Sequence, residues 1–410
     1  MINIAVLGYG TVGSGIVEVL NTNGDSINKR TGKEINIKYV LDLKTFPDDP
    51  INKKIIHDFN IILDDPSIKV IAEVMGGVEP AYTFVKEALL RGKSVCTSNK
   101  ELVAKHGAEL LKIAKDKNIN FLFEASVGGG IPIIRPLNQS LTADEITEIT
   151  GILNGTTNYI LSKMSEEGLD FNTALKQAQD KGFAERNPEA DIEGHDACRK
   201  IAILSSLAYG MQVDFEDIYT EGITKITDID IKYAKVLNTR IKLFASSIKD
   251  GDEVHAMVAP FMINSDHPLY SVNEVFNGIF VKGNVIGDVM FYGSGAGKLP
   301  TASAVVADII DAVKNLDRNI WTNWSSKKLE LTDIKRIKNR FFIRMSNDAA
   351  IYDNKNVEEV IKNKFGVVEL VSVDGIDGEI GFITSDILEA EISEMLKELP
   401  GVLNLIRVRF

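Results

Sequence analysis

Short apolar runs alternate with amphipathic segments along the first 124 residues. Each run is rich in β-branched residues and has the length of a buried strand, whereas the segments between the runs place apolar residues at helical spacing. Strands are predicted at residues 2–7, 34–43, 70–75, 93–97 and 120–124, and helices at 14–20, 80–91 and 101–117. Strands that alternate with helices predict an α/β fold with a doubly wound parallel sheet.

The pattern changes after residue 130, where strand-like runs dominate. The run at 145–153 and the alternating runs within 236–292, including 254–263 and 279–288, predict an α+β domain with an open sheet. Helices are predicted at 132–141, 170–181, 196–208 and 301–316. Residues 341–410 follow the order strand, helix, strand, strand, helix, strand, which is the ferredoxin-like unit. We therefore predict domains at 1–130 (completed by helix 299–317), 131–298 and 341–410, with a linker at 318–340.

The first predicted strand runs directly into a glycine-rich motif, Gly8-Tyr9-Gly10-Thr11-Val12-Gly13. In this setting Gly8 allows a tight turn, Gly10 lets a pyrophosphate approach the backbone, and Gly13 lets the next helix pack on the strand. The free N–H groups and the positive dipole at the start of that helix attract phosphate. The motif predicts a Rossmann domain that binds a dinucleotide, and the alternative is a glycine-rich turn without a ligand.

Several polar residues follow the other predicted strands at their carboxyl ends, where ligands bind in such sheets. Asp42 ends the second strand, a position where a ribose-binding acid is often found. Gly76 follows the next strand, and Ser98 and Lys100 follow the strand at 93–97. We expect these residues at the cofactor edge of the sheet, although a solvated lysine at a helix start would also explain Lys100.

Two loops that follow the parallel sheet could bind small ligands. Residues 124–132 contain three successive glycines, so backbone carbonyl groups are free to wrap a ligand or a hard monovalent cation, and the alternative is a flexible hinge. Residues 154–158 form a polar cluster at the start of a helix, where N–H groups can meet a carboxylate, and a simple helix cap explains the same pattern. A further glycine loop at 293–297 precedes the helix at 301–316.

Asp196 and Lys200 lie four residues apart in a segment that is apolar beyond them. On a helix this spacing puts both side chains on one face. A lysine beside a carboxylate could protonate a small polar substrate, whereas an ordinary surface ion pair of this kind contributes only ~0.3–0.5 kcal/mol. Taken alone the spacing favours the ordinary ion pair, and the other motifs of the chain favour the first interpretation.

The composition excludes several classes of partner. The chain carries 58 acidic and 46 basic residues, a formal net charge of −12, and no long basic run, which argues against nucleic acid and anionic membranes. No apolar stretch approaches the ~20 residues of a membrane helix, and a strand at residue 2 leaves no room for a signal peptide. We expect a cytoplasmic protein whose two cysteines are reduced. The five histidines lack metal-ligand spacing.

Together these motifs resemble the homoserine dehydrogenase family with a C-terminal ACT-type domain. The resemblance spans nearly the whole chain, and its carriers are residues 8–13, 97–100, 124–132, 151–158, 191–200, 295–297 and 300–303. The segments around 154 and at 191–200 are specific to the family, and the first glycine motif is not. The resemblance implies reversible interconversion of L-homoserine and L-aspartate 4-semialdehyde with NAD or NADP, in threonine and methionine biosynthesis.

The resemblance also implies roles for single residues. Lys200 resembles the lysine that protonates the nascent alkoxide, Asp196 resembles its partner, and Lys100 resembles a second lysine near substrate and nicotinamide. The residues that the resemblance implies for substrate binding are Glu185, Asp191, Gly155 and Thr156. Those implied for cofactor binding are Gly8, Gly10, Thr11, Val12, Gly13, Asp42, Gly76, Ser98, Lys100 and Gly297. Those implied for a Na⁺ or K⁺ site are Glu124, Val127, Gly129 and Ile131. A positioned ammonium suits this reaction, since hydride transfer to an aldehyde builds negative charge on oxygen.

The chain departs from the family pattern at three places. Leu41 precedes Asp42 where many members carry an arginine for the 2′-phosphate of NADP, so NAD is expected to be used at least as well as NADP. Lys44 acts in the opposite direction, because its charge could neutralise that phosphate. Phe183 stands where a tyrosine is common. Residues 346–356 lack the Asp-x-Pro-Gly turn that binds effector amino acids, so this domain is expected to serve assembly or another ligand. The open middle sheet indicates a homodimer or homotetramer.

Two other functions compete with this interpretation. A different small-molecule Rossmann oxidoreductase would share the first domain, but phosphorylating semialdehyde dehydrogenases need a nucleophilic cysteine, and Cys198 does not lie at a glycine-backed turn. A protein that senses the cofactor without catalysing a reaction would also share the first domain. Both candidate lysines and the acidic residues argue against a silent protein.

Overall fold

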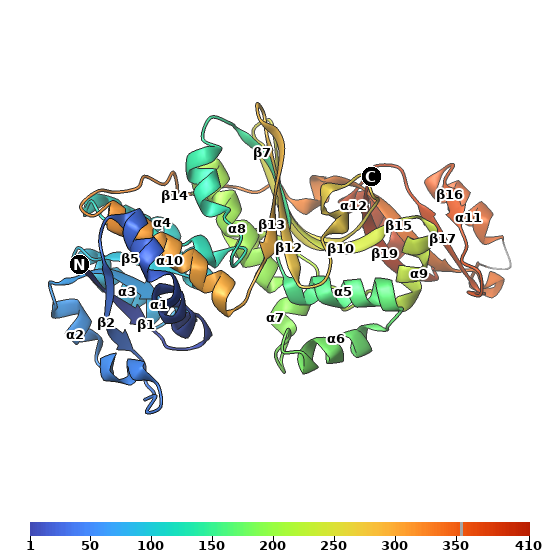
Figure 1. Ribbon diagram of the computed structural model, residues 1–410. Coiled ribbons are helices and arrows are strands. Elements are labelled where there is room, and N and C mark those ends of the chain that lie inside the picture. The colour runs from blue at the N-terminus through green and yellow to red at the C-terminus, as the bar shows by residue number, and fades with distance from the viewer. Residues whose placement is uncertain (353–355) are drawn as a thin grey trace.

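The structure, a computed structural model, describes residues 1–352 and 356–410. The molecule is elongated, with the N-terminal domain at one end and the C-terminal strands and helices at the other (Figure 1). Among the described residues, no helix combines the length and the apolar character that a bilayer span requires.

The N-terminal domain is built on a six-stranded sheet in the order β3-β2-β1-β4-β5-β6, and all pairs are parallel. Its strands are β1 (Ile2–Leu7), β2 (Ile35–Leu41), β3 (Ile55–Ile56), β4 (Ile68–Glu73), β5 (Ser94–Thr97) and β6 (Phe121–Leu122). The predicted doubly wound sheet is therefore confirmed, and the short β3 is an addition to it.

Helices cover this sheet: α1 (Thr11–Thr31), α2 (Phe59–Asp64), α3 (Ala81–Leu90), α4 (Lys100–Asp116) and α10 (Lys298–Lys314). The last of these comes from far along the sequence and packs beside α1 (Figure 1). The contact is close because Gly15 has no side chain, and a Cβ there would lie 2.8 Å from the backbone oxygen of Lys298. Val305 and Ile309 of α10 are fully buried in the same core as Ile4 and Val6.

The centre of the molecule is a mixed sheet of 11 strands. Its central strands are β7 (Ile146–Ile152), β10 (Arg240–Asp250), β11 (Glu253–Ile263), β12 (Phe276–Gly283) and β13 (Gly287–Ser294). Helix α8 (His195–Tyr209) packs against β7 and β10, and α5 (Gly155–Glu167) packs against β10 and β12. The remaining helices of this part are α6 (Phe171–Asp180), α7 (Glu189–Ile192) and α9 (Asp228–Val236).

Two sequence-based elements of this region are wrong. The run predicted at 279–288 is divided by the β12–β13 turn, where the Asp144 carboxylate accepts from the N–H groups of Val285 and Ile286 at 2.8 and 2.7 Å. The helix predicted at 132–141 shrinks to a short helical stretch that ends in a π-turn at Pro136–Ser140. Pro136 cannot donate a backbone hydrogen bond, which disfavours a longer regular helix.

The C-terminal residues have the predicted strand and helix order, with β15 (Lys338–Ser346), α11 (Val357–Phe365), β16 (Glu369–Val371), β17 (Glu379–Ile383), α12 (Glu389–Lys397) and β19 (Val402–Arg409). A two-residue strand, β18 (Ile387–Leu388), precedes α12. The spatial order is β19-β15-β17-β16, and β19 pairs in parallel with β11. This C-terminal unit therefore extends the central sheet.

Two buried arginines tie the C-terminal unit to the rest of the protein. Arg344 on β15 contacts Asp230 of α9 at 2.8 Å and Glu379 of β17 at 2.7 Å. Arg407 on β19 contacts Glu389 of α12 and Glu221, which follows β9 (Tyr219–Thr220). Each arginine thus links a strand of the unit to a residue outside it.

The segment at 318–340 runs across the molecule between the two ends (Figure 1). It is anchored on the way, because β14 (Ser325–Lys328) pairs with β8 (Met211–Gln212). The buried indole of Trp324 donates to the Gln212 side chain at 3.0 Å. The segment is thus anchored at these points, while most of its side chains are half-buried or exposed.

Candidate active site

The start of α8 brings the predicted lysine and its carboxylate together. Gly194 precedes the helix with a φ of 84°, and a Cβ there would lie 3.0 Å from Val258. Asp196 and Lys200 then lie on one helix face, as predicted, with 2.7 Å between the Lys200 ammonium and Oδ2 of Asp196. Both side chains are buried. This is therefore not an ordinary surface ion pair.

Lys100 reaches the other oxygen of the same carboxylate from the N-terminal domain. It is the first residue of α4, whose N-cap Asn99 accepts from the N–H of Leu102 at 3.1 Å. Its ammonium forms an ion pair with Oδ1 of Asp196. The carboxylate consequently lies between two ammonium groups that come from different domains.

Burial and charge set the protonation of these groups. Burial alone would raise the pKa of Asp196, but the ammonium groups of Lys200 and Lys100 hold it well below its usual range. Burial lowers the pKa of Lys200, and repulsion from Lys100 adds to this effect. The pKa of Lys100 is raised instead, since the attraction of Asp196 outweighs its burial. Of the two lysines, Lys200 is therefore the one that releases a proton more readily.

A cavity of about 570 Å³ opens onto this triad. The residues predicted for the site that line it are Lys100, Gly155, Thr156, Glu185, Asp191, Asp196, Lys200 and Gly297. Asn154, the first residue of the predicted polar cluster, lines the cavity as well, and so do Asn187 and Arg199, to which sequence reasoning gave no role. Burial raises the pKa of Asp191. The cavity thus combines two lysines, several carboxylates and the start of α5, which suits a small zwitterion.

The glycine motif forms the turn that its spacing predicts. Gly8 has a φ of 96°, and a Cβ at Gly13 would lie 2.0 Å from the backbone oxygen of Gly8, so the helix packs tightly on the strand. A Cβ at Gly10 would meet nothing within 4 Å, which leaves open space for a ligand above the backbone. Asp42 accepts from the N–H groups of Tyr9 and Lys44 at 2.7 and 2.9 Å. The loop can therefore receive a pyrophosphate.

The remaining predicted cofactor residues lie at the same carboxyl edge of the sheet. Thr11 and Val12 begin α1, Gly76 follows β4 with a φ of 83°, and Ser98 donates its N–H to the Glu73 carbonyl at 3.4 Å. None of these lines the 570 Å³ cavity, to which Lys100 and Gly297 belong. The predicted cofactor residues are therefore divided between this edge of the sheet and the cavity.

Comparison with known proteins decides the family. The sequence profile described as "Homoserine dehydrogenase, NAD binding domain" matches residues 8–124, and the one described as "Homoserine dehydrogenase" matches residues 132–310. The chain belongs to the homoserine dehydrogenase family. It is accordingly an oxidoreductase with homoserine and aspartate semialdehyde as its substrates.

Several relatives match this homoserine dehydrogenase over nearly their full length. The homoserine dehydrogenase of Bacillus subtilis (strain 168) is 37% identical, and the match covers 97% of this chain and 94% of the relative. That of Synechocystis sp. is 39% identical over 99% of both chains. A crystal structure of a homoserine dehydrogenase from Thiobacillus denitrificans has a TM-score of 0.89 at 33% identity, covering 100% of this chain and 98% of the other.

The glycine loop of this homoserine dehydrogenase is organised by a buried carboxylate. Glu124 accepts from the N–H groups of Ile133 and Ile134 at 2.6 and 2.8 Å and from Arg135 at 2.8 Å. Gly129 has a φ of 56°, and a Cβ there would lie 2.5 Å from the Gly295 oxygen. The two glycine loops therefore pack against each other. Among the residues that the structure describes, no cluster of three or more His, Cys, Asp or Glu could hold a metal.

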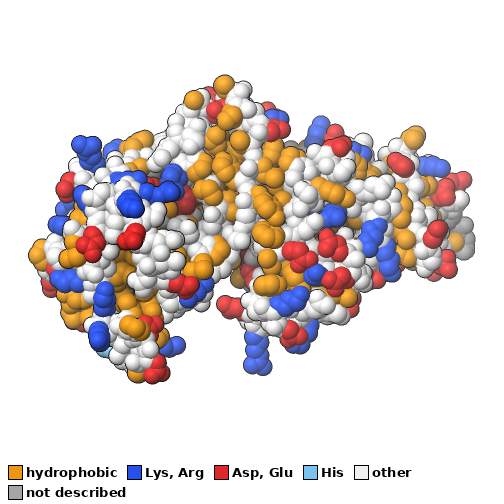
Figure 2. Space-filling view, in the orientation of Figure 1, with side chains coloured by type: hydrophobic (Ala, Val, Ile, Leu, Met, Phe, Trp, Pro, Cys, Tyr) orange, Lys and Arg blue, Asp and Glu red, His pale blue; other side chains and the backbone are white. Residues whose placement is uncertain are grey.

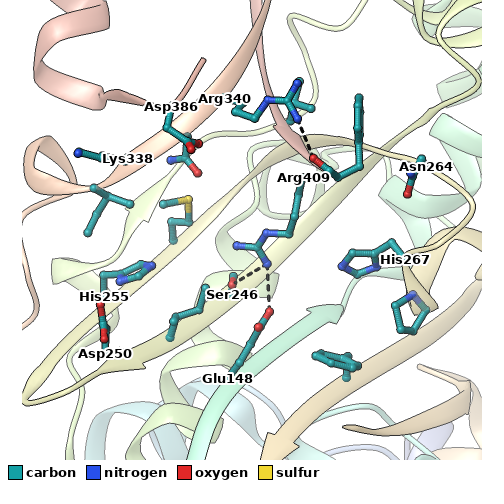
Figure 3. Close-up of a pocket in the computed structure, with 18 of the residues that line it drawn as sticks. Glu148, Ser246, Asp250, His255, Asn264, His267, Lys338, Arg340, Asp386 and Arg409 are labelled. Carbon is teal, nitrogen blue, oxygen red and sulfur yellow. Dashed lines mark hydrogen bonds and ion pairs between the residues drawn. The ribbon is translucent and has the colours of Figure 1, made fainter. Parts of the chain in front are cut away.

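A second, larger cavity of about 850 Å³ lies between the central sheet and strands of the C-terminal unit (Figure 3). Its charged groups are partly paired with one another. Arg409 contacts Glu148 and Ser246 at 3.1 and 3.5 Å, and Arg340 donates to the Phe410 oxygen at 2.8 Å. None of the predicted site residues lines it. The larger cavity therefore does not contain the candidate active site.

Proposed function

We propose that this homoserine dehydrogenase uses Lys200 to move the proton and Lys100 to stabilise charge on the substrate oxygen. The observation that carries the proposal is the Asp196 carboxylate, which lies between the two ammonium groups at the wall of the cavity. A homoserine-dependent rise in the absorbance of reduced nicotinamide, present in the wild type and lost in Lys200→Ala, tests it.

The charges suit both directions of the reaction. When bound, the nicotinamide supplies or accepts the hydride, and the negative charge develops on the substrate oxygen. Lys200 donates its proton to that oxygen during aldehyde reduction, and its lowered pKa makes it a stronger acid than a free lysine. Asp196 stays ionised and keeps both lysines in place. Lys100, with its raised pKa, remains a fixed positive charge.

Two carboxylates are proposed to bind the substrate ammonium, and the start of α5 its carboxylate. Glu185 and Asp191 line the same cavity as the lysines. The N–H groups of Gly155 and Thr156 lie in the first turn of α5, where N–H groups and the helix dipole favour an anion. The Thr156 hydroxyl donates to the Phe183 carbonyl at 2.6 Å, which fixes the loop that carries Glu185.

NAD is proposed to serve at least as well as NADP. Asp42 can accept from a ribose 2′-hydroxyl but repels a 2′-phosphate. We expect kcat/KM with NAD to equal or exceed that with NADP, measured with homoserine saturating. A strong NADP preference would show that Lys44 or another cation outweighs Asp42, and Lys44→Ala would then reduce the use of NADP selectively. A similar archaeal homoserine dehydrogenase, 29% identical with a TM-score of 0.65 over 76% of this chain and 97% of the other, was solved in complex with NADPH.

A monovalent cation, Na⁺ or K⁺, is proposed to bind the glycine loop. Its ligands would be backbone carbonyl groups of Glu124, Val127, Gly129 and Ile131. The Glu124 carboxylate is engaged by three backbone N–H groups, so it shapes the loop and leaves the carbonyl groups as donors. Hard oxygen donors suit such ions.

The C-terminal unit at 341–410 is proposed to be an ACT-type domain that does not respond to threonine. The region of the effector turn is occupied by Asp348, whose carboxylate accepts from the N–H of Ala350 at 3.0 Å, and by Tyr352, whose hydroxyl donates to the Ser346 carbonyl at 2.7 Å. These contacts use groups that an effector carboxylate would need. Asp353, which also belongs to this region of the sequence, lies outside the described residues.

L-Threonine is therefore expected to inhibit weakly or not at all. Initial rates measured over a range of threonine concentrations at several homoserine concentrations test this. Weak inhibition that is competitive with homoserine would reflect binding in the active site, since the two amino acids are similar. Submillimolar inhibition that homoserine does not relieve would contradict the prediction.

The remaining proposals concern assembly and cellular role. We propose a homodimer or homotetramer, because β13 lies at the end of the central sheet and exposes Met290 and Tyr292. Apolar side chains gather on the face over the middle of the molecule (Figure 2).

A cytoplasmic location fits the two free, buried cysteines, and the reaction fits threonine and methionine biosynthesis. We further propose domains at 1–130 with 299–317, at 131–298 and at 341–410.

A further inference from the structure

Asn154 connects the two carboxylates of the site. It follows β7 directly before α5 and is buried, with 5% of its surface exposed. Its amide nitrogen donates to Oδ1 of Asp191 at 2.7 Å and to Oδ2 of Asp196 at 2.9 Å. The two N–H groups of this amide therefore donate to two acidic residues, which lie on different helices.

The other end of the amide fixes its orientation. Oδ1 of Asn154 accepts from the backbone N–H of Thr157 at 2.8 Å and so caps α5. A reversed amide would point its oxygen at two carboxylates and its nitrogen at an N–H donor, which no hydrogen-bond pattern allows. The side chain thus has a single orientation, and its donors face the carboxylates.

The same loop also holds the proton donor. The backbone oxygen of Leu153 accepts from the Lys200 ammonium at 2.7 Å. Residues 153 and 154 accordingly contact Lys200, its partner Asp196 and the carboxylate proposed to bind the substrate ammonium. Two carboxylates this close would normally favour protonation of one of them. A neutral amide donor keeps both in place without adding charge.

We propose that Asn154 is a positioning residue that fixes the distance between the substrate-binding carboxylate Asp191 and the proton-transfer pair of Asp196 and Lys200. The proposal rests on the proposed roles of those three residues. If it is correct, loss of the amide donors displaces the substrate relative to Lys200, because the carboxylates then separate. Helix capping alone would predict no such effect.

Asn154→Asp separates positioning from capping. Aspartate caps helices as well as asparagine does, so α5 should stay intact. The variant loses the amide donors and adds a negative charge near Lys200, whose other charged neighbours are Asp196 on α8, Lys100 on α4 and Asp191 on α7. We expect kcat/KM for homoserine to fall at least ~10-fold, the scale of a lost hydrogen bond to a charged group, with little change in the Kd of the cofactor. Tm should fall, because the new carboxylate faces two others, and far-UV circular dichroism checks that the variant is folded.

The pH profile gives a readout that capping would not move. Homoserine oxidation needs unprotonated Lys200 as base, so kcat rises as pH passes its pKa. An added carboxylate raises that pKa, and the rising limb should move to higher pH in Asn154→Asp. Asn154→Ser keeps a cap but is too short to reach both carboxylates, so it should lose activity without this movement. Asp170→Asn is the matched control, because it exchanges carboxylate and amide at the exposed N-cap of α6.

Each outcome decides the question. If either folded variant keeps kcat/KM within twofold of the wild type, or if Asn154→Asp leaves the rising limb in place, the proposal is wrong. Both variants retain a helix cap, so if neither folds, the amide donors of Asn154 serve the stability of the fold and the proposal is also wrong. Activity of Lys200→Ala at the wild-type rate would instead refute the proposed roles of the site, and so the two failures are distinguishable.

Discussion

Replacing Lys200 with alanine is expected to lower kcat at least ~100-fold, the usual scale for a positioned acid or base. The variant should fold, because Lys100 remains as a partner for the buried Asp196 carboxylate. The Kd of the cofactor should stay near the wild-type value, since the glycine motif lies outside the cavity that Lys200 lines. Steady-state rates with homoserine and cofactor titration by fluorescence measure the two quantities.

A matched control is Lys176→Ala, which removes an exposed lysine that pairs with Asp180 four residues along α6. Its kcat should not change. Turnover of Lys200→Ala at the wild-type rate would exclude Lys200 as the proton donor and would direct attention to Lys100, the other ammonium beside Asp196.

Replacing Arg407 with methionine should lower the free energy of unfolding by ~3–5 kcal/mol, the typical cost of leaving a buried ion pair half complete. Arg407 contacts the Glu389 carboxylate through Nε at 2.6 Å and through a second nitrogen at 2.9 Å, and contacts Glu221 at 2.8 Å. Burial would lower the pKa of Arg407, but hydrogen bonding and attraction to Glu389 raise it, so the guanidinium stays protonated. Urea unfolding followed by circular dichroism measures the loss.

The double variant Arg407→Met with Glu389→Leu tests the cause. It removes both charges, so most of the lost stability should return, because an apolar pair leaves less buried charge without a partner. Arg336→Met is the control at the surface, where the pair with Glu253 is well exposed and should contribute less than ~1 kcal/mol. A single Arg407 variant as stable as the wild type would show that water reaches Glu389.

Local patterns predicted the N-terminal domain well. β1 has the predicted bounds, and the turn at Gly8 has the positive φ that its motif requires. The spacing of Asp196 and Lys200 predicted their shared helix face. These features depend on residues close in sequence, which is why period and motif identify them.

Contacts between residues far apart in the sequence leave no such local pattern. Lys100 and Asp196 meet across two domains, and only the family resemblance brought them together before the structure did. The pattern at Asn154 predicted a helix cap, and Asn154 does cap α5. Its amide N–H groups, however, donate to residues about 40 positions away in the sequence. The pairing of β19 with β11 likewise joins segments that look complete when taken separately. Periodicity does not encode which strand will be a neighbour.

The parallel pairing of β11 with β19 has a consequence for the order of folding during synthesis. Phe261, Met262 and Ile263 pair with residues 407–409. Ribosomes add ~5–20 residues per second, so β11 waits on the order of ten seconds for its neighbour. Throughout that interval its edge carries unpaired N–H and C=O groups, which invite pairing with other chains. The nascent chain is therefore exposed to misassembly along this edge after the residues of the proposed active site have been synthesised.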